Sequence, residues 1–314
     1  MTNKTQTRET EEQRRTRIRG ETLEAIANAQ KIRVTNPQHE VVLVVDDKYA
    51  QNSVGLASEK RSVIPAYDFE TACQAMEEVS PNVVLTDIEF PRSLEYRQDI
   101  SPEEQAALER QRKSLFRGIT DRIKEHFAGR EERIHELDSY ASKLYRPGEK
   151  IDFTKKRGIE LAEELQTFGV NYGLAIVDKV QRKQIPYAVV TSTNHGNVAP
   201  GLVALGVCTE QEVVNELGKY KTLQAEMFEN EAKWEENLRA LTHLEAKLGK
   251  AIFVGHEGFD RVEIRGKDLL IWQKAYELAT GQSTSYKPAE SKADSPVPKS
   301  EGVFSRLRNY FAGR

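Results

Sequence analysis

The stretch Val41-Val42-Leu43-Val44-Val45-Asp46-Asp47 decides the fold, because it is a short aliphatic run that ends in two acidic residues. Such a run, bounded by polar residues, predicts a strand that is buried on both faces of a sheet. The pattern returns at residues 82–87, Asn-Val-Val-Leu-Thr-Asp, and another buried strand is predicted at residues 187–192, Tyr-Ala-Val-Val-Thr-Ser. Strands of this kind belong at the centre of a parallel sheet that helices cover on both faces.

Weaker signals fill the sequence between these strands. Residues 62–66 are predicted to form a further strand, and residues 50–58 a short helix. Apolar and small residues at helical spacing predict longer helices over residues 69–79 and 173–183. Because strands and helices alternate, we expect an α/β fold with a doubly wound parallel sheet.

Composition and charge exclude several classes of protein. The 314 residues suffice for one large or two modest domains, and 49 acidic against 46 basic residues give a net charge of −3, which argues against a nucleic-acid binder. No run approaches the roughly 18 apolar residues of a membrane span, and residues 1–31 lack the apolar segment of a secretory signal. Cys73 and Cys208 form no CxxC pair, so a disulfide scaffold and a zinc ribbon are excluded. We therefore expect a cytoplasmic protein.

Two long charged segments interrupt the segments that form the sheet. Apolar residues recur at helical spacing in both, so we predict helical insertions at residues 93–168 and 208–250. These helices could lie on their own domain or bind a partner, which includes a second copy of this chain in a homodimer. The apolar positions of the first insertion are Leu108, Leu115, Ile119, Ile123, Phe127, Ile134, Leu137 and Leu144. Those of the second are Leu217, Tyr220, Leu223, Met227, Trp234, Leu238, Leu241, Leu244 and Leu248.

The remaining segments complete the domain organisation. A charged, solvated helical arm is expected at residues 1–38, ahead of the sheet domain. The sheet domain is expected to comprise residues 39–92, 169–207 and 251–281. Trp272 lies on a helical apolar face of its last part, and we expect it in the core.

The end of the chain has a different character. Residues 282–301 form a polar linker with prolines, which cannot build a core. Residues 302–314 place apolar side chains on one helical face together with three arginines, so they predict a basic amphipathic helix. A helix this short needs a docking surface, either the groove of a protein partner or an anionic membrane. The alternative is that it folds back on its own domain.

Acidic side chains follow the first and third predicted strands of the chain, at the point where each strand ends. Asp46 and Asp47 end one strand, Asp87 ends the other, and Thr191 ends the strand that comes next. Because ligands bind at the carboxyl ends of the strands in a doubly wound sheet, we expect these side chains to converge. Three carboxylates in one place require a cation, and oxygen ligands suit Mg²⁺. The sequence therefore predicts a magnesium site.

This arrangement resembles the receiver domain of response regulators, the flavodoxin-like module of two-component signalling. Residues 43–47, Leu-Val-Val-Asp-Asp, resemble its first strand and acidic pair. Residues 83–91, Val-Val-Leu-Thr-Asp-Ile-Glu-Phe-Pro, resemble its third strand, phospho-accepting aspartate and following proline. Residues 184–192 resemble its fourth strand, and residues 204–207, Ala-Leu-Gly-Val, the small-residue turn before its fifth.

The resemblance implies a role for each residue of the constellation. Asp46 and Asp47 would hold Mg²⁺ together with the backbone carbonyl of Glu89. Asp87 would accept a phosphoryl group, and the hydroxyl of Thr191 would bind the new phosphate. It also implies a histidine kinase as a partner. The match covers the chain from the first strand to Pro91 and, after an interruption, resumes near Tyr172.

The last part of the chain departs from that pattern. The best candidate for the fifth strand, residues 251–256, follows about 40 charged residues and is not followed by Lys-Pro. Gly255 or His256 falls where the lysine of a receiver would stand, so we expect one counter-charge for an acyl phosphate to be missing. His195, just after the fourth strand, is a candidate phosphate contact or proton donor. The alternative is that it caps the next helix.

Three functions remain open. The first is a receiver-like signalling or regulatory protein that acts through protein–protein interaction, with Asp87 as the phospho-acceptor. The second is a Mg²⁺-dependent phosphohydrolase with Asp87 as nucleophile, since Asp87-Ile88-Glu89 has some likeness to an Asp-x-Asp motif. The third is a scaffolding protein with a degenerate receiver core. The missing lysine favours the third, whereas the joint presence of Asp46, Asp47, Asp87 and Thr191 disfavours it.

Overall fold

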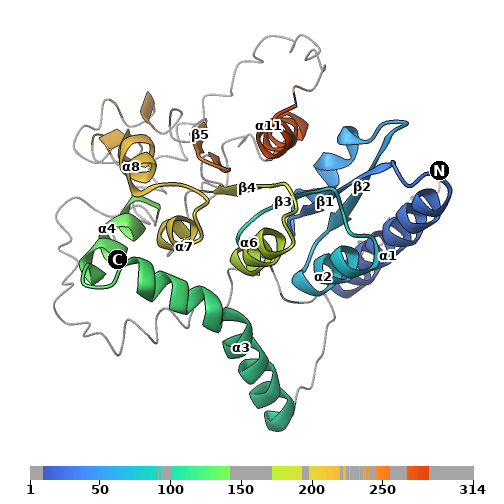
Figure 1. Cartoon of the computed structure of the whole chain (residues 1–314), viewed down its shortest axis with the longest axis horizontal. Helices are drawn as coiled ribbons and strands as arrows, with labels where there is room; N and C mark the ends of the chain where they lie inside the picture. Colours follow the sequence, from blue (N-terminus) through green and yellow to red (C-terminus); the bar gives the residue numbers. More distant parts are fainter. Residues whose placement is uncertain are drawn as a thin grey trace, which may run out of the picture. The chain divides into compact units, whose positions relative to one another are not determined.

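The chain folds around one six-stranded sheet, with the strand order β2-β1-β3-β4-β6-β5 (Figure 1). The computed structural model describes residues 10–90, 92, 101–141, 172–192, 198–219, 245–254 and 267–282, together with isolated positions between 222 and 240. The strands are β1 (Glu40–Val45), β2 (Arg61–Ala66), β3 (Val83–Thr86), β4 (Tyr187–Ser192), β5 (Glu245–Leu248) and β6 (Ala251–Val254). Every neighbouring pair is parallel except β5 and β6, which form an antiparallel hairpin. The predicted α/β class is confirmed.

The order of the strands reverses between β1 and β3. From β1 the chain passes to β2 on one side, whereas β3, β4 and β6 follow one another on the other side. β1 and β3 pair in register, with Val42 opposite Val83 and Val45 opposite Thr86. The residues that follow these two strands therefore emerge side by side, at the point where open α/β sheets bind ligands.

Helices cover both faces of the sheet, as the doubly buried strands require (Figure 1). Alternate side chains of β1 enter two separate cores: Leu43 packs in one and Val44 in the other. The first core is built with α1 (Glu11–Thr35), α2 (Phe69–Glu78), α3 (Pro102–His126), α4 (Glu131–Ala141), α6 (Tyr172–Arg182) and α7 (Val198–Ala204). The second is built with η1 (Ala50–Leu56) and α11 (Leu269–Thr280).

The described part of the first insertion is helical, as predicted. Its helices α3 and α4 are separated by a turn at Gly129, which has a positive φ of 74°. They pack beside the sheet domain against α7, and their apolar side chains enter the first core. The buried members are Phe116, Ile119, Ile123, Phe127, Ile134 and Leu137. This apolar face is therefore used within the chain, and the homodimer remains a prediction.

The second insertion is helical only in part. It begins with α8 (Glu210–Glu212) and the π-helical η3 (Val213–Leu217), whereas residues 245–248 form strand β5. The prediction of a helix as far as Leu248 is wrong at this end. In β5 the side chains alternate between exposed and buried, with Ala246 and Leu248 inside, so a stripe of so few apolar residues fits a strand as well as a helix. Most of residues 220–244 lies outside the described residues.

The amino-terminal arm is a helix, but it is not solvated all round. Ile26 and Ala29 of α1 are buried in the first core. The hydroxyl of Thr22 donates a hydrogen bond of 2.8 Å to the carbonyl oxygen of Pro65 in β2. The high charge of this segment concealed a narrow buried stripe, so the expectation of a solvated arm is corrected. The linker and the basic helix predicted at residues 302–314 lie outside the described residues, apart from Gln282.

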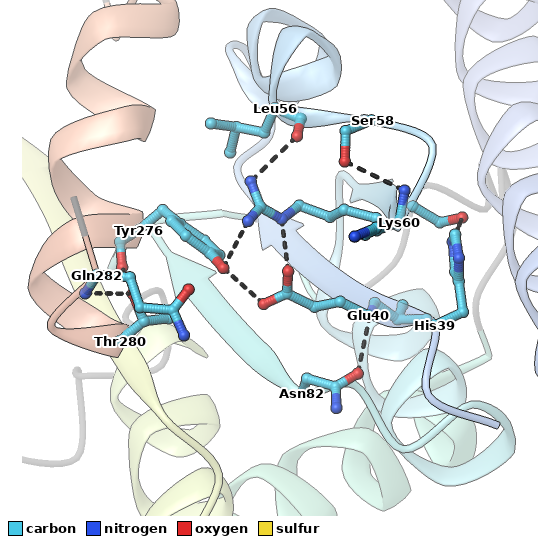
Figure 2. A network of polar contacts seen from close by, with 12 residues as sticks. His39, Glu40, Leu56, Ser58, Lys60, Asn82, Tyr276, Thr280 and Gln282 are labelled. Atoms are coloured by element: carbon cyan, nitrogen blue, oxygen red, sulfur yellow. Dashed lines mark hydrogen bonds and ion pairs between the residues drawn. The ribbon is translucent and has the colours of Figure 1, made fainter. Parts of the chain in front are cut away.

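Helix α11 is fixed to the amino ends of β1 and β2 by a polar network (Figure 2). Arg61 donates from Nη2 to the Tyr276 hydroxyl at 2.7 Å, and that hydroxyl donates to Oε1 of Glu40 at 2.6 Å. Arg61 also pairs with Glu40 directly at 2.6 Å and stacks over the Tyr276 ring. This network lies at the opposite end of β1 from Asp46.

Among the described residues, no helix is long and apolar enough to cross a membrane.

Candidate functional site

The three predicted aspartates meet at the carboxyl edge of the sheet. Asp46 and Asp47 directly follow β1, and Asp87 directly follows β3. One carboxylate oxygen from each of the three lies within 4.8 Å of the others, which is close enough to share one cation. The prediction that these carboxylates converge is confirmed. They form the acidic site: Asp46, Asp47 and Asp87.

Asp46 is the most firmly held of the three. It is fully buried, and its Oδ1 accepts hydrogen bonds from the backbone N–H groups of Lys48 and Tyr49, at 2.9 and 2.6 Å. This is the local turn that an aspartate makes with the backbone just beyond it. Its Oδ2 accepts from the ammonium group of Lys267 at 2.7 Å. Both oxygens of Asp46 therefore already have donors.

Lys267 was not foreseen at this site. Its ammonium group forms ion pairs with Asp46 and with Asp87, and the residue is only 2% exposed. Burial by itself lowers the pKa of Lys267, but the negative charges of Asp46 and Asp87 outweigh burial and raise the pKa above its ordinary value. Lys267 is therefore charged at neutral pH. The expectation that this site lacks a counter-charge is wrong.

The lysine escaped the sequence analysis because of where it stands in the chain. Strand β6 ends at Val254, and Lys267 comes only after residues 255–266, which lie outside the described residues. Lys267 immediately precedes helix α11, whose N-cap is Asp268; the Asp268 carboxylate accepts from the N–H of Ile271 at 3.0 Å. A lysine and a capping aspartate before an apolar helix were the signal in the sequence. Periodicity locates that helix, but it does not place its first turn at the acidic site.

Asp47 adds a third negative charge to the site. Burial, followed by the charges of Asp46 and Asp87, raises the pKa of Asp47 to about 6. When all three carboxylates are ionised and Lys267 is protonated, these four groups have an excess of two negative charges. A divalent cation would neutralise them, and a cluster of carboxylate oxygens is the donor set that Mg²⁺ prefers. The residues present therefore fit a magnesium ion.

Asp87 is held from two directions. Its Oδ1 accepts from the N–H of Ile88 at 2.6 Å, and its Oδ2 faces Lys267. The first turn of α6 presses on the same loop, where the N–H of Gly173 donates to the carbonyl oxygen of Ile88 at 2.9 Å. A Cβ at Gly173 would overlap the carbonyl oxygen of Asp87, so only glycine fits here. Glu89 lies in the described loop and is partly buried, and its role as a metal ligand stays a prediction.

Thr191 lies near the carboxyl end of β4, as predicted, and is completely buried. Its hydroxyl has no hydrogen-bond partner among the described residues, and leaving a buried hydroxyl unpaired costs about 1–3 kcal/mol. In the parallel pairing Thr86 lies opposite Val189, so Thr191, two residues further along β4, is level with Ile88, the residue after Asp87. A group placed on Asp87 could supply the missing acceptor. His195, the other candidate phosphate contact, lies outside the described residues.

No protein-family model, curated protein or solved structure matches this chain. The assignment of a class of protein therefore depends on the geometry of the acidic site and on the sheet that carries it.

Proposed function

We propose that this protein is a receiver-like regulatory protein that accepts a phosphoryl group on Asp87 and acts by binding protein partners. One observation carries the proposal: the buried ammonium group of Lys267 contacts both Asp46 and Asp87. A structural ion pair would need a single carboxylate. An acyl phosphate on Asp87, in contrast, needs a cation beside the aspartate that carries it.

The topology supports the same assignment. The parallel strands, numbered along the chain without the β5 hairpin strand, follow the order 2-1-3-4-5, which is that of flavodoxin-like sheets. The acidic site lies where that order reverses, at the ends of β1 and β3. We infer a flavodoxin-like fold of the receiver type, in which Lys267 takes the part of the lysine that the sequence lacks directly after the fifth strand.

In this phosphoryl transfer, each residue of the site would have a separate role. A carboxylate oxygen of Asp87 forms a bond to phosphorus, while the bond from phosphorus to the donor breaks and the leaving group departs with the bonding electrons. Lys267 then faces the new acyl phosphate instead of a free carboxylate, and the Thr191 hydroxyl donates to a phosphoryl oxygen. Mg²⁺, held by Asp46, Asp47 and Asp87, would offset negative charge on the transferring group.

A phosphohydrolase and a scaffold remain the competing functions. Lys267 weakens the case for a scaffold with a degenerate core, because a protein that needs no chemistry gains little from burying Asp46, Asp87 and Lys267 together. A hydrolase would use the same nucleophile, but it would release phosphate over many turnovers, whereas a receiver-like protein retains one phosphoryl group per chain.

The test is acetyl phosphate with Mg²⁺, followed by intact-mass measurement of the full chain. We expect the mass of one phosphoryl group to appear in the wild type and to be absent from D87N. A matched control is D121N, which changes an exposed aspartate on α3 and should label normally. No labelling of the wild type, or equal labelling of D87N, would overturn the proposal. Continuous release of phosphate without retained label would instead favour the phosphohydrolase.

A further inference from the structure

The turn that follows β1 and the first turn of α11 are joined in a closed ring of hydrogen bonds. Lys267 donates to Oδ2 of Asp46, and Oδ1 of the same carboxylate accepts from the N–H of Tyr49. The carbonyl oxygen of Tyr49 in turn accepts from the indole Nε1 of Trp272, at 3.2 Å. The backbone N–H of Trp272 donates to the carbonyl oxygen of Asp268, the residue after Lys267, also at 3.2 Å. The ring therefore begins and ends on the first turn of α11.

Close packing supports this ring. Trp272 is fully buried in the second core, in which Tyr49 and Leu269 are partly buried members. Leu269 lies so close to Gly55 of η1 that a Cβ on that glycine would meet its side chain at 2.6 Å. Asn52, also in η1, donates from Nδ2 to the carbonyl oxygen of Lys267 at 3.1 Å. The segment after Asp47 and the start of α11 therefore form one interface.

The position of Lys267 depends on this interface, because the lysine is not at the end of a strand. Residues 255–266 separate it from β6, so the sheet does not fix its position through the chain. The sequence stretches that carry Asp47 and Lys267 meet through the ring described above. Besides the bond from Lys267 to Asp46, the indole N–H of Trp272 gives the turn and the helix a second connection, through the carbonyl oxygen of Tyr49.

We propose that Trp272 is a positioning residue for the acidic site: its indole N–H holds the turn at residues 46–49 against the first turn of α11, and so fixes Asp47 and Lys267 relative to each other. The role goes beyond the proposed function by assigning the control of site geometry to a residue whose indole N–H binds a backbone carbonyl and not a carboxylate. This positioning role rests on the proposed function in one respect: the geometry that Trp272 fixes is the geometry that phosphoryl transfer to Asp87 would use. Removing a group that orients a metal site typically lowers metal affinity about 10- to 100-fold.

The test compares W272F with Y276F in the full chain. Both residues lie on α11 and are almost completely buried, and both variants keep an aromatic ring while losing a polar group. The Tyr276 hydroxyl, however, binds Glu40 and Arg61 at the far end of β1 (Figure 2). We expect W272F to weaken Mg²⁺ binding about tenfold by calorimetry. We expect Y276F to bind Mg²⁺ as the wild type does.

A second measurement needs no metal. Hydrogen exchange of the Tyr49 amide, which donates to Asp46, should accelerate about tenfold in W272F and stay unchanged in Y276F, whereas the amides within β1 should stay protected in both. If W272F does not fold, N52A serves in its place, with N215A on the exposed side of η3 as its control. Unchanged exchange at Tyr49 in a folded W272F or N52A would overturn the positioning role.

The two proposals fail in different ways. If the wild type takes up neither Mg²⁺ nor a phosphoryl group while the Tyr49 amide still responds to W272F, the proposed function is wrong and the positioning role stands. If the wild type is phosphorylated normally and W272F changes neither exchange nor Mg²⁺ affinity, the proposed function stands and the positioning role is wrong.

Discussion

Replacement of Lys267 by methionine is the most direct perturbation of this structure. The variant keeps a side chain of similar length and leaves Asp46 and Asp87 buried without their cation. Removing one partner of a buried ion pair typically costs about 3–5 kcal/mol, because the remaining charge loses its compensation. For a folded unit of this size that corresponds to a fall in melting temperature on the order of 10 °C.

Thermal unfolding by circular dichroism, without Mg²⁺ and near neutral pH, measures the effect. The control is K274M, on the helix that follows Lys267, which breaks a partly exposed pair with Glu245 that is worth about 0–1 kcal/mol. The double variant K267M/D87N should recover part of the lost stability, because it removes one uncompensated charge. K267M should also bind Mg²⁺ more tightly than the wild type, since the cation then takes the place of the ammonium group.

The pH dependence of the stability tests whether the charge of Lys267 causes this stabilisation. Because the pKa of Lys267 is raised in the folded chain, its stabilisation is complete below the ordinary value of 10.5 and is lost only as the pH rises further. The difference between wild type and K267M should therefore not vanish between neutral pH and that value. A K267M variant no less stable than K274M would refute the view that Lys267 compensates Asp46 and Asp87.

Two further predictions concern the carboxylates and the glycine beside them. The folded-state pKa of Asp47 is raised from 3.8 to about 6, so its negative charge destabilises the metal-free chain above that pH. D47N should therefore be more stable than the wild type at neutral pH, and the difference in stability should shrink as the pH falls from about 6 towards 3.8. Urea unfolding at several pH values measures this difference. A constant difference over that range would show that Asp47 does not titrate as described. G173A should cost about 1–3 kcal/mol and reduce labelling of Asp87 by acetyl phosphate, because its Cβ overlaps the Asp87 backbone. G118A on α3 has room for a Cβ and should unfold like the wild type or later; equal behaviour of the two variants would contradict the close fit at Asp87.

The sequence predicted the fold well where a pattern of apolar residues is compatible with only one type of secondary structure. The aliphatic runs before Asp46 and Asp87 are too short for buried helices and too apolar for edge strands, so β1 and β3 followed from them. The convergence of the carboxylates then followed from parallel pairing alone. Strand β5 was missed because Leu248 fits both the helical and the strand period, although Gly249, at a positive φ of 52°, marks the short turn that leads to β6.

Lys267 was missed for a different reason. A motif places residues that are close in sequence, whereas this lysine reaches the site through the docking of a whole helix. The contacts that dock it, from Trp272 to Tyr49 and from Asn52 to the lysine carbonyl, each join residues more than 200 positions apart. Such pairs carry no periodic signal, so a site completed by tertiary packing is visible only once the helices are placed.

Contacts between residues that are distant in sequence also explain how one sheet domain tolerates long interruptions. The chain leaves the site after Ile88 and returns at Gly173, where a backbone hydrogen bond of 2.9 Å joins the two points. It leaves again after Val207 and returns at Lys250, whose N–H donates to the Val207 carbonyl, also at 2.9 Å. At both returns a glycine stands where a Cβ would strike the backbone of the segment that leaves: Gly173 at Asp87, and Gly249 at Val207. Since the entropy cost of closing a loop grows only slowly with its length, fixing the two ends in contact lets the intervening segment lengthen without displacing the site. The segment after residues 255–266 is held differently, by the side-chain hydrogen bond from Trp272 to Tyr49, and this bond and the closure at Gly173 together hold Lys267 and Asp87 at the acidic site.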